Sequence, residues 1–472
     1  MLFVRYTSSV LAMLLCVTPM CCVTAFAQPN FSEVDRILQD SLSKLGGTTA
    51  LDGGGAALVI WKTGTNGNVG SVVYERSYAL PGKTYTVNKL VPIASATKGL
   101  SGLVIMGMID DGVITLENTI GEIIPDVDAS KRDITIRQLF SFTSGLQGNL
   151  TGPTACVENT AYSGTLADCV SDVLQRQLVA TPGAAFNYGS DGMHVAGRLA
   201  EIKSGLPYPS GDAWDSLFVK YVTKPLSLTL TGFDLKGFCE TDNTRIDGGG
   251  GSTANEYLQA LIMILQGGEY KGRRVLSAQA LETMSSDQTR GATIGYTPYL
   301  QYEILRPGIK NTRYGVGFWR ERIDSASGRA LEIASQGKFG FSPWIDFERG
   351  YCAVLSVRSD LTVMYPTYLK LKDAIRRAFD ATTGVSSDDS INDDNSANKE
   401  PHQLWELVGF VDVLGRNVDP LTCAYCLCIE RTPFDNSTLE QHFGVLAQRY
   451  RVRPLSSCQA RERMLQEPTH PR

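Results

Sequence analysis

Ser95 and Lys98 are the residues of this sequence best placed to do chemistry. Residues three apart share one face of a helix, so a helix over residues 95–110 would bring the serine hydroxyl beside the lysine amine. A serine is a weak nucleophile at neutral pH unless a neighbouring base takes its proton, and a partly desolvated lysine can be that base. The pair therefore predicts nucleophilic catalysis through Ser95.

The same Ser-x-x-Lys spacing occurs three more times, so the surroundings of each copy must decide. Residues 91–94 predict an extended approach to Ser95, and residues 99–112 are apolar on most sides, as in a helix buried in a large domain that ends at Gly112. The N–H groups and positive dipole end of that helix would lie near Ser95. The simpler alternative is that Ser95 only caps the helix and Lys98 is solvated. The other copies are Ser41/Lys44, Ser335/Lys338 and Ser396/Lys399.

Composition and charge describe an ordinary globular chain. Of the 472 residues, 43% are hydrophobic and 20% are charged, and the net charge is −5. This composition argues against disorder, and neither the charge nor any Lys/Arg block predicts a nucleic-acid partner. We find no sequence repeat that would indicate a solenoid or propeller. The length allows one large domain or two to three ordinary ones.

The N-terminus has the pattern of an export signal. Arg5 supplies positive charge, residues 10–17 form a short apolar core, and residues 25–27 (AFA) are a small-x-small cleavage site before Gln28. An uncleaved anchor is the alternative, but the apolar core is shorter than a membrane span, and no later segment is long enough to be one. We therefore predict a signal peptide over residues 1–27, a secreted protein and no stable membrane span.

Export would favour disulfides and glycosylation. The sequence has eleven cysteines, of which Cys16, Cys21 and Cys22 lie in the predicted signal. The remaining eight are an even number, as expected if cysteines pair in disulfides. Cys156 and Cys169 would close a short loop and are the best-supported pair, and Cys239 with Cys352 is a weaker second. Glycosylation sequons begin at Asn30, Asn149 and Asn436.

The expected elements run from strands to helices and back to strands. Strands are expected over residues 56–61, 69–78, 314–319, 330–335, 342–346 and 351–357. Helical periodicity covers residues 31–46, 134–140, 254–265 and 366–380, and residues 130–290 are mostly helix and loop. This order predicts an α+β fold with one antiparallel sheet, flanked by helices and interrupted by a mainly helical region.

The chain is expected to end in a linker and a tail. Residues 382–401 are polar and acidic, as in a linker, which argues against Ser396/Lys399 as a catalytic pair. The catalytic domain would then cover residues 28–381. Residues 402–472 would form a cysteine-containing tail, whose degree of order the sequence leaves open. Its Cys423-x-x-Cys426-x-Cys428 motif lacks a second ligand pair, so we favour disulfides or a loosely ordered tail over zinc and predict no metal.

Three further stretches join Ser95 in a recognisable order. Tyr188 follows a Pro-Gly turn and precedes a helical pattern over residues 193–201, residues 134–146 read as a helix ending at a Gly turn, and residues 335–346 read as a Gly-punctuated strand entry. Together they resemble the penicillin-recognising serine hydrolases, especially the class C β-lactamase-like branch with its carboxylesterases and D-amino-acid peptidases. The resemblance covers roughly residues 31–380 and includes residues 248–257 (GGGGSTANEY) and 314–319 (YGVGFW).

The resemblance implies a β-lactamase/transpeptidase-like fold and a role for each site residue. Ser95 would be the acylated nucleophile, with Lys98 and Tyr188 as its proton-handling partners; which of the two carries the proton stays open. The oxyanion hole would be the backbone N–H groups of Ser95 and Lys338, and one such donor is worth about 3 kcal/mol of barrier. Gly337 would leave room for the strand to approach the substrate. No cofactor is implied, and the substrate would be a small ester, amide or peptide.

The sequence departs from the family pattern at three places. Ser190 replaces the asparagine of the usual Tyr-x-Asn, Ser335-Gln336-Gly337 replaces Lys/His-Thr-Gly, and Phe142 stands where relatives often have histidine. Ser190 and Ser335 are therefore expected to bind substrate through short hydroxyls. The loss of a cation or imidazole at this motif favours hydrolysis of a small ester or amide over true β-lactamase activity.

A Ser-His-Asp triad is the obvious chemical alternative, and two other functions remain open. Three of the four histidines (His402, His442 and His470) fall in the tail, His194 reads as a packed or surface side chain, and no Gly-x-Ser-x-Gly elbow follows a strand convincingly, so we reject the triad. The altered motifs leave open a ligand-binding pseudoenzyme, because one fold hosts many functions. Acyl transfer to an acceptor other than water is the third alternative. We make no prediction of the oligomeric state.

Overall fold

A computed structural model describes residues 28–45, 54–64, 69–148, 155–158, 164–206, 212–233, 243–298 and 313–383. All of them belong to the first of the two units, residues 1–389 and 390–472, into which the chain divides. The predicted signal peptide, the tail and residues 384–401 of the predicted linker lie outside the described residues. The export signal, the tail motif, the Ser396/Lys399 pair and the domain boundaries therefore stay predictions.

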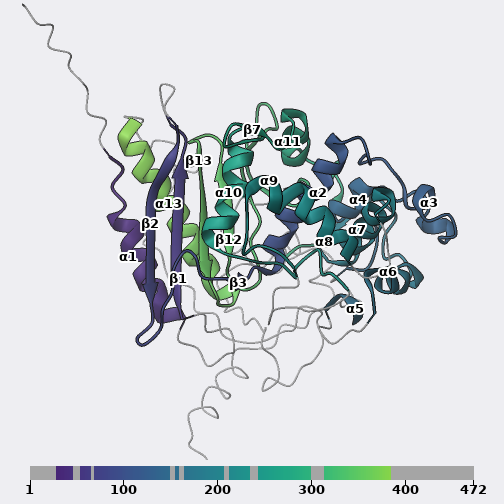
Figure 1. Ribbon diagram of the computed structural model, residues 1–472, viewed down its shortest axis with the longest axis horizontal. Coiled ribbons are helices and arrows are strands. Elements are labelled where there is room, and N and C mark those ends of the chain that lie inside the picture. The colour runs from purple at the N-terminus through teal and green to yellow at the C-terminus, as the bar shows by residue number, and fades with distance from the viewer. Residues whose placement is uncertain are drawn as a thin grey trace, which may run out of the picture. The chain divides into compact units, whose positions relative to one another are not determined.

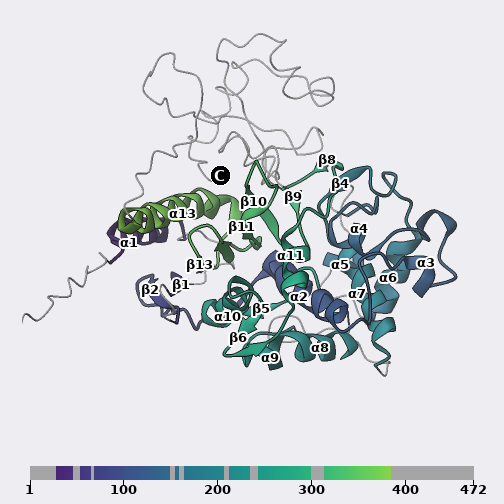
Figure 2. The same cartoon turned by 90° about the horizontal axis from the view of Figure 1, so that it is seen from above.

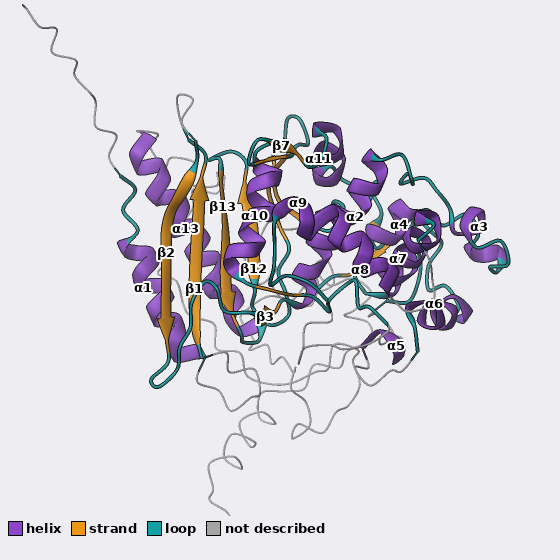
Figure 3. Ribbon diagram, viewed as in Figure 1, coloured by secondary structure: helices purple, strands orange, loops and turns teal. Residues whose placement is uncertain are grey.

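A seven-stranded antiparallel sheet in the order β2-β1-β13-β12-β11-β10-β9 organises the fold (Figure 3). The strands near the N-terminus join those near the C-terminus where β1 pairs with β13, for example Val59 opposite Val354. This confirms the predicted α+β class with one main antiparallel sheet. The bounds are β1 Gly55–Lys62, β2 Ser71–Ala79, β9 Arg313–Tyr314, β10 Trp319–Ile323, β11 Ala330–Ala334, β12 Ser342–Asp346 and β13 Tyr351–Val357.

The middle of the sheet is buried on both faces. Every residue of β12 and β13 is buried, and β1 is buried as far as Trp61. Such unbroken burial requires helices on both sides. Figure 2 shows α1 (Ser32–Ser41) and α13 (Leu361–Thr383) on one side of these strands and α10 (Ala254–Leu265) on the other.

The chain between β2 and β9 forms the predicted, mainly helical region (Figure 1). Its helices are α2 Thr97–Asp110, α3 Ile120–Ile123, α4 Ile136–Phe140, α5 Ala155–Glu158, α6 Leu166–Gln175, α7 Asp191–Ser204, α8 Asp212–Phe218, α9 Lys224–Leu226, α10 and α11 Ala278–Ser285. Three small sheets accompany them: β3 Val91–Pro92 with β5 Gly251–Ser252, β4 Ala185–Asn187 with β8 Thr293–Tyr296, and β6 Glu269–Tyr270 with β7 Arg273–Arg274. The β3–β5 pair brings the approach to Ser95 beside the glycine run at residues 248–251.

The single strand predicted over residues 314–319 is wrong. β9 ends at Tyr314 and β10 begins at Trp319, and these two residues are antiparallel partners across a turn. Gly317 in that turn has a φ of +84°, a left-handed conformation that favours glycine. A Cβ on Gly317 would lie 2.3 Å from the backbone oxygen of Lys98, so the turn packs its backbone directly on α2.

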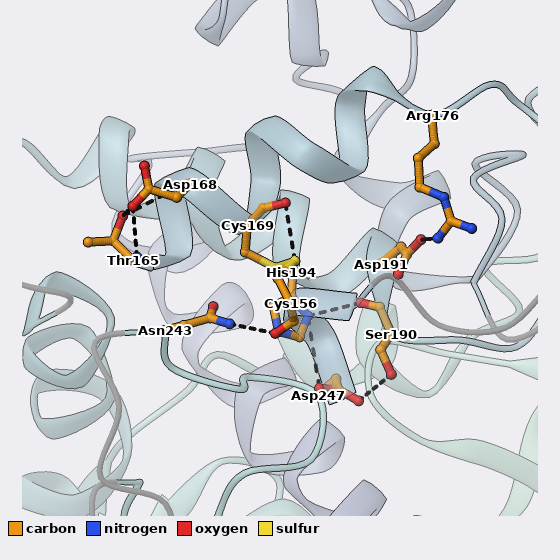
Figure 4. Close-up of a disulfide and its surroundings, with 10 residues drawn as sticks. All are labelled: Cys156, Thr165, Asp168, Cys169, Arg176, Ser190, Asp191, His194, Asn243 and Asp247. Atoms are coloured by element: carbon orange, nitrogen blue, oxygen red, sulfur yellow. Dashed lines mark hydrogen bonds and ion pairs between the residues drawn. A yellow bond between two sulfur atoms is a disulfide. The ribbon is translucent and has the colours of Figure 1, made fainter. Parts of the chain in front are cut away.

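One of the two predicted disulfides is present. Cys156 and Cys169 are joined, with their Cα atoms 5.4 Å apart, and so connect α5 to α6 (Figure 4). The weaker prediction, Cys239 with Cys352, is wrong, because Cys352 carries a free thiol inside β13, where both faces of the sheet are covered. Burial raises the pKa of this thiol well above its usual value. Cys239 itself lies outside the described residues.

The described ranges contain neither a membrane-spanning helix nor a cluster of metal ligands. None of the helices in these ranges is long and apolar enough to cross a bilayer. Within the same residues, His, Cys, Asp and Glu side chains form no group of three or more that could hold a metal ion. The cysteine motif of the tail lies outside the described residues.

Candidate active site

Ser95 lies at the entrance to α2, in a short 3₁₀ turn over Ala94–Ala96 rather than in the helix itself. Ala94 has a φ of +44°, which is unusual for a residue with a side chain and marks local strain. The alternative that Ser95 caps the helix is wrong, because the N-cap of α2 is Ala96 and no side-chain cap is present. The serine is partly exposed and is therefore open to a substrate.

Lys98 faces Ser95 from the first turn of α2. Its Nζ lies 3.1 Å from Ser95 Oγ, and the side chain is only 2% exposed, so the alternative of a solvated lysine is wrong as well. Two more acceptors surround Nζ: the backbone oxygen of Asp247 at 2.9 Å and the Oδ2 of the same residue at 3.3 Å. The predicted serine and lysine are thus in direct contact inside the protein.

The burial of Lys98 follows from the composition of α2. Every residue of this helix from Thr97 to Met108 is buried, as its apolar sequence predicted. Glycine on α2 allows close packing, since a Cβ on Gly102 would lie 2.6 Å from the backbone oxygen of Val316 in the β9–β10 turn. No face of the helix is left for the lysine to reach water.

Tyr188 lies beside Lys98, in the segment between β4 and α7. Lys98 Nζ is 5.0 Å from the centre of the tyrosine ring, and the tyrosine is 7% exposed. The ring stacks on Trp319 with centroids 5.2 Å apart and contacts Phe142 at 4.7 Å. Phe142, where relatives often have histidine, therefore contributes packing that fixes the tyrosine.

Asp247 was missed in the sequence, although it contacts both Lys98 and Ser190. Ser190 Oγ donates a hydrogen bond to Asp247 Oδ2 at 2.5 Å (Figure 4). The aspartate precedes the glycines at 248–251, and a Cβ on Gly250 would lie only 2.8 Å from Thr97 Oγ1. The glycine run thus lets the Asp247 segment pass close to the start of α2, and this run was the available signal.

The charges of Lys98 and Asp247 support one another. Burial lowers the pKa of Lys98, but the oxygen of Tyr188 and the carboxylate of Asp247 outweigh it and raise that pKa above its usual value. Burial raises the pKa of Asp247, but the charge of the contacting Lys98, helped by Arg245, outweighs it and holds this pKa well below its usual value. Both groups are therefore ionised near neutral pH and form a buried ion pair.

The two serines expected to bind substrate are placed differently. Ser190 directs its only hydroxyl proton at Asp247, so its predicted role in binding substrate is not supported by this contact. Ser335 Oγ donates to the backbone oxygen of Ser95 at 3.3 Å and so lies beside the predicted nucleophile. Gln336, the next residue, points elsewhere and donates to the hydroxyl of Tyr368 at 2.9 Å. The alternation of side chains at the end of β11 explains the difference.

Gly337 and Lys338 continue this segment past the end of β11. A Cβ on Gly337 would lie 2.0 Å from the backbone oxygen of Ile93, so only glycine allows the segment to approach the turn that carries Ser95. Lys338 follows in a turn with its side chain exposed. Among the described residues its backbone N–H has no acceptor, which leaves this donor free for the predicted oxyanion hole.

The competing serine-lysine pairs are not assembled. Ser335 contacts the Ser95 backbone while Lys338 is exposed. Ser41 Oγ donates to the backbone oxygen of Leu38 at 2.6 Å, and Lys44 Nζ binds the hydroxyl of Thr367 at 2.9 Å. Of the copies in the described ranges, Ser95/Lys98 is the one whose side chains meet.

His194 does not complete a triad with Ser95. It is fully buried, and its Nδ1 lies 3.2 Å from the backbone oxygen of Ser190 and 3.9 Å from Asp247 Oδ1. Burial lowers the pKa of His194 despite the nearby carboxylate, so the imidazole is neutral. The sequence-based rejection of the triad is consistent with this placement, in which the histidine belongs to the surroundings of Asp247.

Comparison with known proteins decides the family. The family model described as Beta-lactamase matches residues 49–373, more than half of the chain. The chain belongs to the beta-lactamase family. A solved structure from Bacteroides dorei DSM 17855, described as a candidate β-lactamase, is 26% identical in sequence to this chain and has a TM-score of 0.60. The match covers 73% of this chain and 99% of the Bacteroides dorei chain. The family and fold predicted from the sequence are confirmed.

Two further comparisons are weaker. The solved structure of EstCE1, described as a hydrolase with promiscuous acyltransferase activity, shares 19% identity, covers 73% of this chain and 97% of its own, and has a TM-score of 0.56, a likeness of fold alone. Penicillin-binding protein 4 of Amycolatopsis lactamdurans is 26% identical over 178 residues, 37% of this chain and 43% of the relative. The chain thus spans less than half the length of that curated relative.

Proposed function

We propose that this beta-lactamase-family protein is a serine hydrolase that forms an acyl-enzyme on Ser95 and hydrolyses a small ester or amide. The observation that carries the proposal is the 3.1 Å contact between Lys98 Nζ and Ser95 Oγ in a buried setting, with Tyr188 beside the amine. Family membership supports a hydrolase in general terms.

The proposed reaction has two half-reactions. Ser95 Oγ attacks the carbonyl carbon, and its proton passes to the oxygen of Tyr188, because the Lys98 ammonium has no lone pair to accept it. The oxyanion accepts hydrogen bonds from the N–H groups of Ser95 and Lys338. The carbon–leaving-group bond then breaks, and the leaving group takes the proton. Water attacks the acyl-enzyme in the second half-reaction, which releases the acid and restores the serine.

The surroundings of Ser95 favour an uncharged ester or amide over a β-lactam. Ser335 presents a neutral hydroxyl near the nucleophile, and Gln336 points away from it. The positive charge of Lys98 is paired with Asp247. A substrate carboxylate would therefore find no unpaired positive charge among Ser335, Gln336 and Lys98 to bind it, whereas a neutral acyl group needs none.

We also propose that the protein is secreted. The signal pattern over residues 1–27 predicts export. The Cys156–Cys169 disulfide supports it, because such bonds persist in oxidising compartments.

A fluorophosphonate probe tests the nucleophile directly. We expect one adduct, located on Ser95 by mass spectrometry, that is lost in Ser95→Ala and retained in the matched control Ser41→Ala. p-Nitrophenyl esters, nitrocefin and D-amino-acid amides then define the substrate, and ester turnover should disappear in Ser95→Ala. Labelling elsewhere, or none on the folded protein, would refute the proposal, and ligand binding without turnover would point to a pseudoenzyme.

A further inference from the structure

The carboxylate of Asp247 is buried against the amine that faces the proposed nucleophile. Asp247 places two acceptors at Lys98 Nζ, its backbone oxygen at 2.9 Å and its Oδ2 at 3.3 Å, while Ser95 Oγ lies at 3.1 Å and the Tyr188 side chain also interacts with the amine. Asp247 is 4% exposed and Lys98 is 2% exposed, so bulk water competes for neither group. One residue thus determines most of the surroundings of the amine.

Few other groups can compensate the charge of this carboxylate. Ser190 donates to Oδ2 at 2.5 Å, whereas Oδ1 has no hydrogen-bond partner in the described part of the chain. His194 Nδ1 lies 3.9 Å from Oδ1, and burial keeps that imidazole neutral (Figure 4). Lys98 is therefore the main countercharge in contact with Asp247.

Distances alone leave the protonation of Lys98 open. An ammonium would donate to Ser95 Oγ as well as to Asp247, whereas a neutral amine would donate to Asp247 and accept the proton of Ser95. Charge decides between them. A neutral amine would leave a buried carboxylate without a contacting cation, which costs several kcal/mol, whereas an ammonium pairs with it.

The segment that carries Asp247 is held on several sides. Asn243 Nδ2 donates to the backbone oxygen of Cys156 at 2.8 Å, so the segment is tied to the disulfide-bonded cysteine. Ser101 Oγ on α2 donates to the backbone oxygen of Ile246 at 2.6 Å, and Gly250 N donates to Thr97 Oγ1 at 3.0 Å. These contacts pre-organise the carboxylate instead of leaving it to adjust to the lysine.

We propose that Asp247 is a positioning residue of this active site, whose carboxylate fixes Lys98 against Ser95 and keeps it in the ammonium form at neutral pH. The inference rests on the proposed function, in which Ser95 is the nucleophile. Asp247 acts through Lys98 and touches no reacting atom. The other titratable or charged groups around the pair are Tyr188 before α7, Asp191 and His194 on α7, Arg245 of the same segment and Tyr257 on α10.

The first test measures how the rate of fluorophosphonate labelling of Ser95 depends on pH. Asp247→Asn keeps the shape of the side chain and removes its charge. In this variant, the part of the pH–rate profile that reports loss of the Lys98 proton should move to lower pH by about one unit or more, which is a tenfold change in the ammonium-to-amine ratio at fixed pH. Asp111→Asn is the matched control: it removes a carboxylate from an exposed ion pair with Lys220 and should leave the profile unchanged. Ser190→Ala leaves the Asp247 carboxylate in place, so it should not move this part of the profile to lower pH.

A second measurement needs no altered Asp247. NMR spectra of wild-type protein with ¹³C-labelled lysine should show a Lys98 side chain that stays charged up to at least about its ordinary pKa, with the signal assigned by its absence in Lys98→Met. A wild-type Lys98 that loses its proton below about pH 8 would overturn the inference, as would an unshifted Asp247→Asn profile. Wild-type protein that takes no label on Ser95 would instead overturn the proposed function, so the two failures are distinguishable.

Discussion

Replacing Gly337 by alanine should damage catalysis through a backbone contact. The added Cβ would lie 2.0 Å from the backbone oxygen of Ile93, whereas real Cβ contacts are essentially never shorter than 3.0 Å, so the two segments must separate by about 1 Å. The Ile93 oxygen also accepts from Ala96 N at 3.0 Å, within the turn that carries Ser95. The separation therefore displaces the nucleophile and the neighbouring Lys338 N–H relative to one another.

The expected loss follows from the size of that displacement. A misplacement of about 1 Å can cost about 100-fold in rate, and loss of one oxyanion donor costs about 3 kcal/mol, which is a similar factor. We expect kcat for a p-nitrophenyl ester to fall about 100-fold in Gly337→Ala, with a smaller change in KM. Thermal unfolding of the same variant should show a loss of about 1–3 kcal/mol, as for other overpacked sites.

Gly248→Ala is the matched control for this prediction. Gly248 is also near the turn, but its added Cβ would lie 3.8 Å from the nearest atom, a backbone carbon of Ala94, and its φ is not positive. Its kcat should stay within about twofold of wild type, since surface-like substitutions without a clash cost little. If Gly337→Ala retained wild-type kcat, or if both variants lost activity equally, the steric reasoning would be wrong.

Three other outcomes follow from the structure. Tyr188→Phe should keep the fold, because the stacked ring remains, but lower kcat about 100-fold or more, measured with the same ester, through loss of the proton-handling oxygen. Burial raises the pKa of Glu332, but the contacting Lys372 outweighs it and lowers that pKa. The ion pair therefore stabilises the folded protein fully above the unfolded pKa of about 4, and this stabilisation is lost as the pH falls further. Glu332→Gln should lower the free energy of unfolding in urea by about 3–5 kcal/mol at neutral pH and by much less at about pH 2. Reducing Cys156–Cys169, which lie 13 residues apart, should cost about 3 kcal/mol in the same assay, and an unchanged midpoint would contradict that estimate.

Much of the fold was predictable because its signals are local. The apolar periodicity of residues 254–265 matches α10, and the mostly apolar runs at residues 56–61 and 351–357 match β1 and β13. The apolar surroundings of Ser95 also separated it from the amphipathic helix around Ser41. Local pattern failed at residues 314–319, where a glycine turn divides β9 from β10, because both halves are equally apolar.

Asp247 could not be predicted because its importance depends on a distant contact. It lies 149 residues from Lys98 along the chain, and an aspartate before a glycine run reads locally as an ordinary turn. The orientation of the Ser190 hydroxyl could not be predicted either, because it donates to the same aspartate. Sequence spacing can pair a serine with a lysine one helical turn away, but it carries no information about which loop will cover them.

The end of β11 also limits where this enzyme can be shortened or fused. Ser335 rests on the backbone of the nucleophile, and its neighbour Gln336 is bonded to Tyr368 on α13, so a single peptide unit joins the reaction centre to the last described helix. A truncation that removes turns of α13 would therefore be felt at Ser95 although it cuts far from it in sequence.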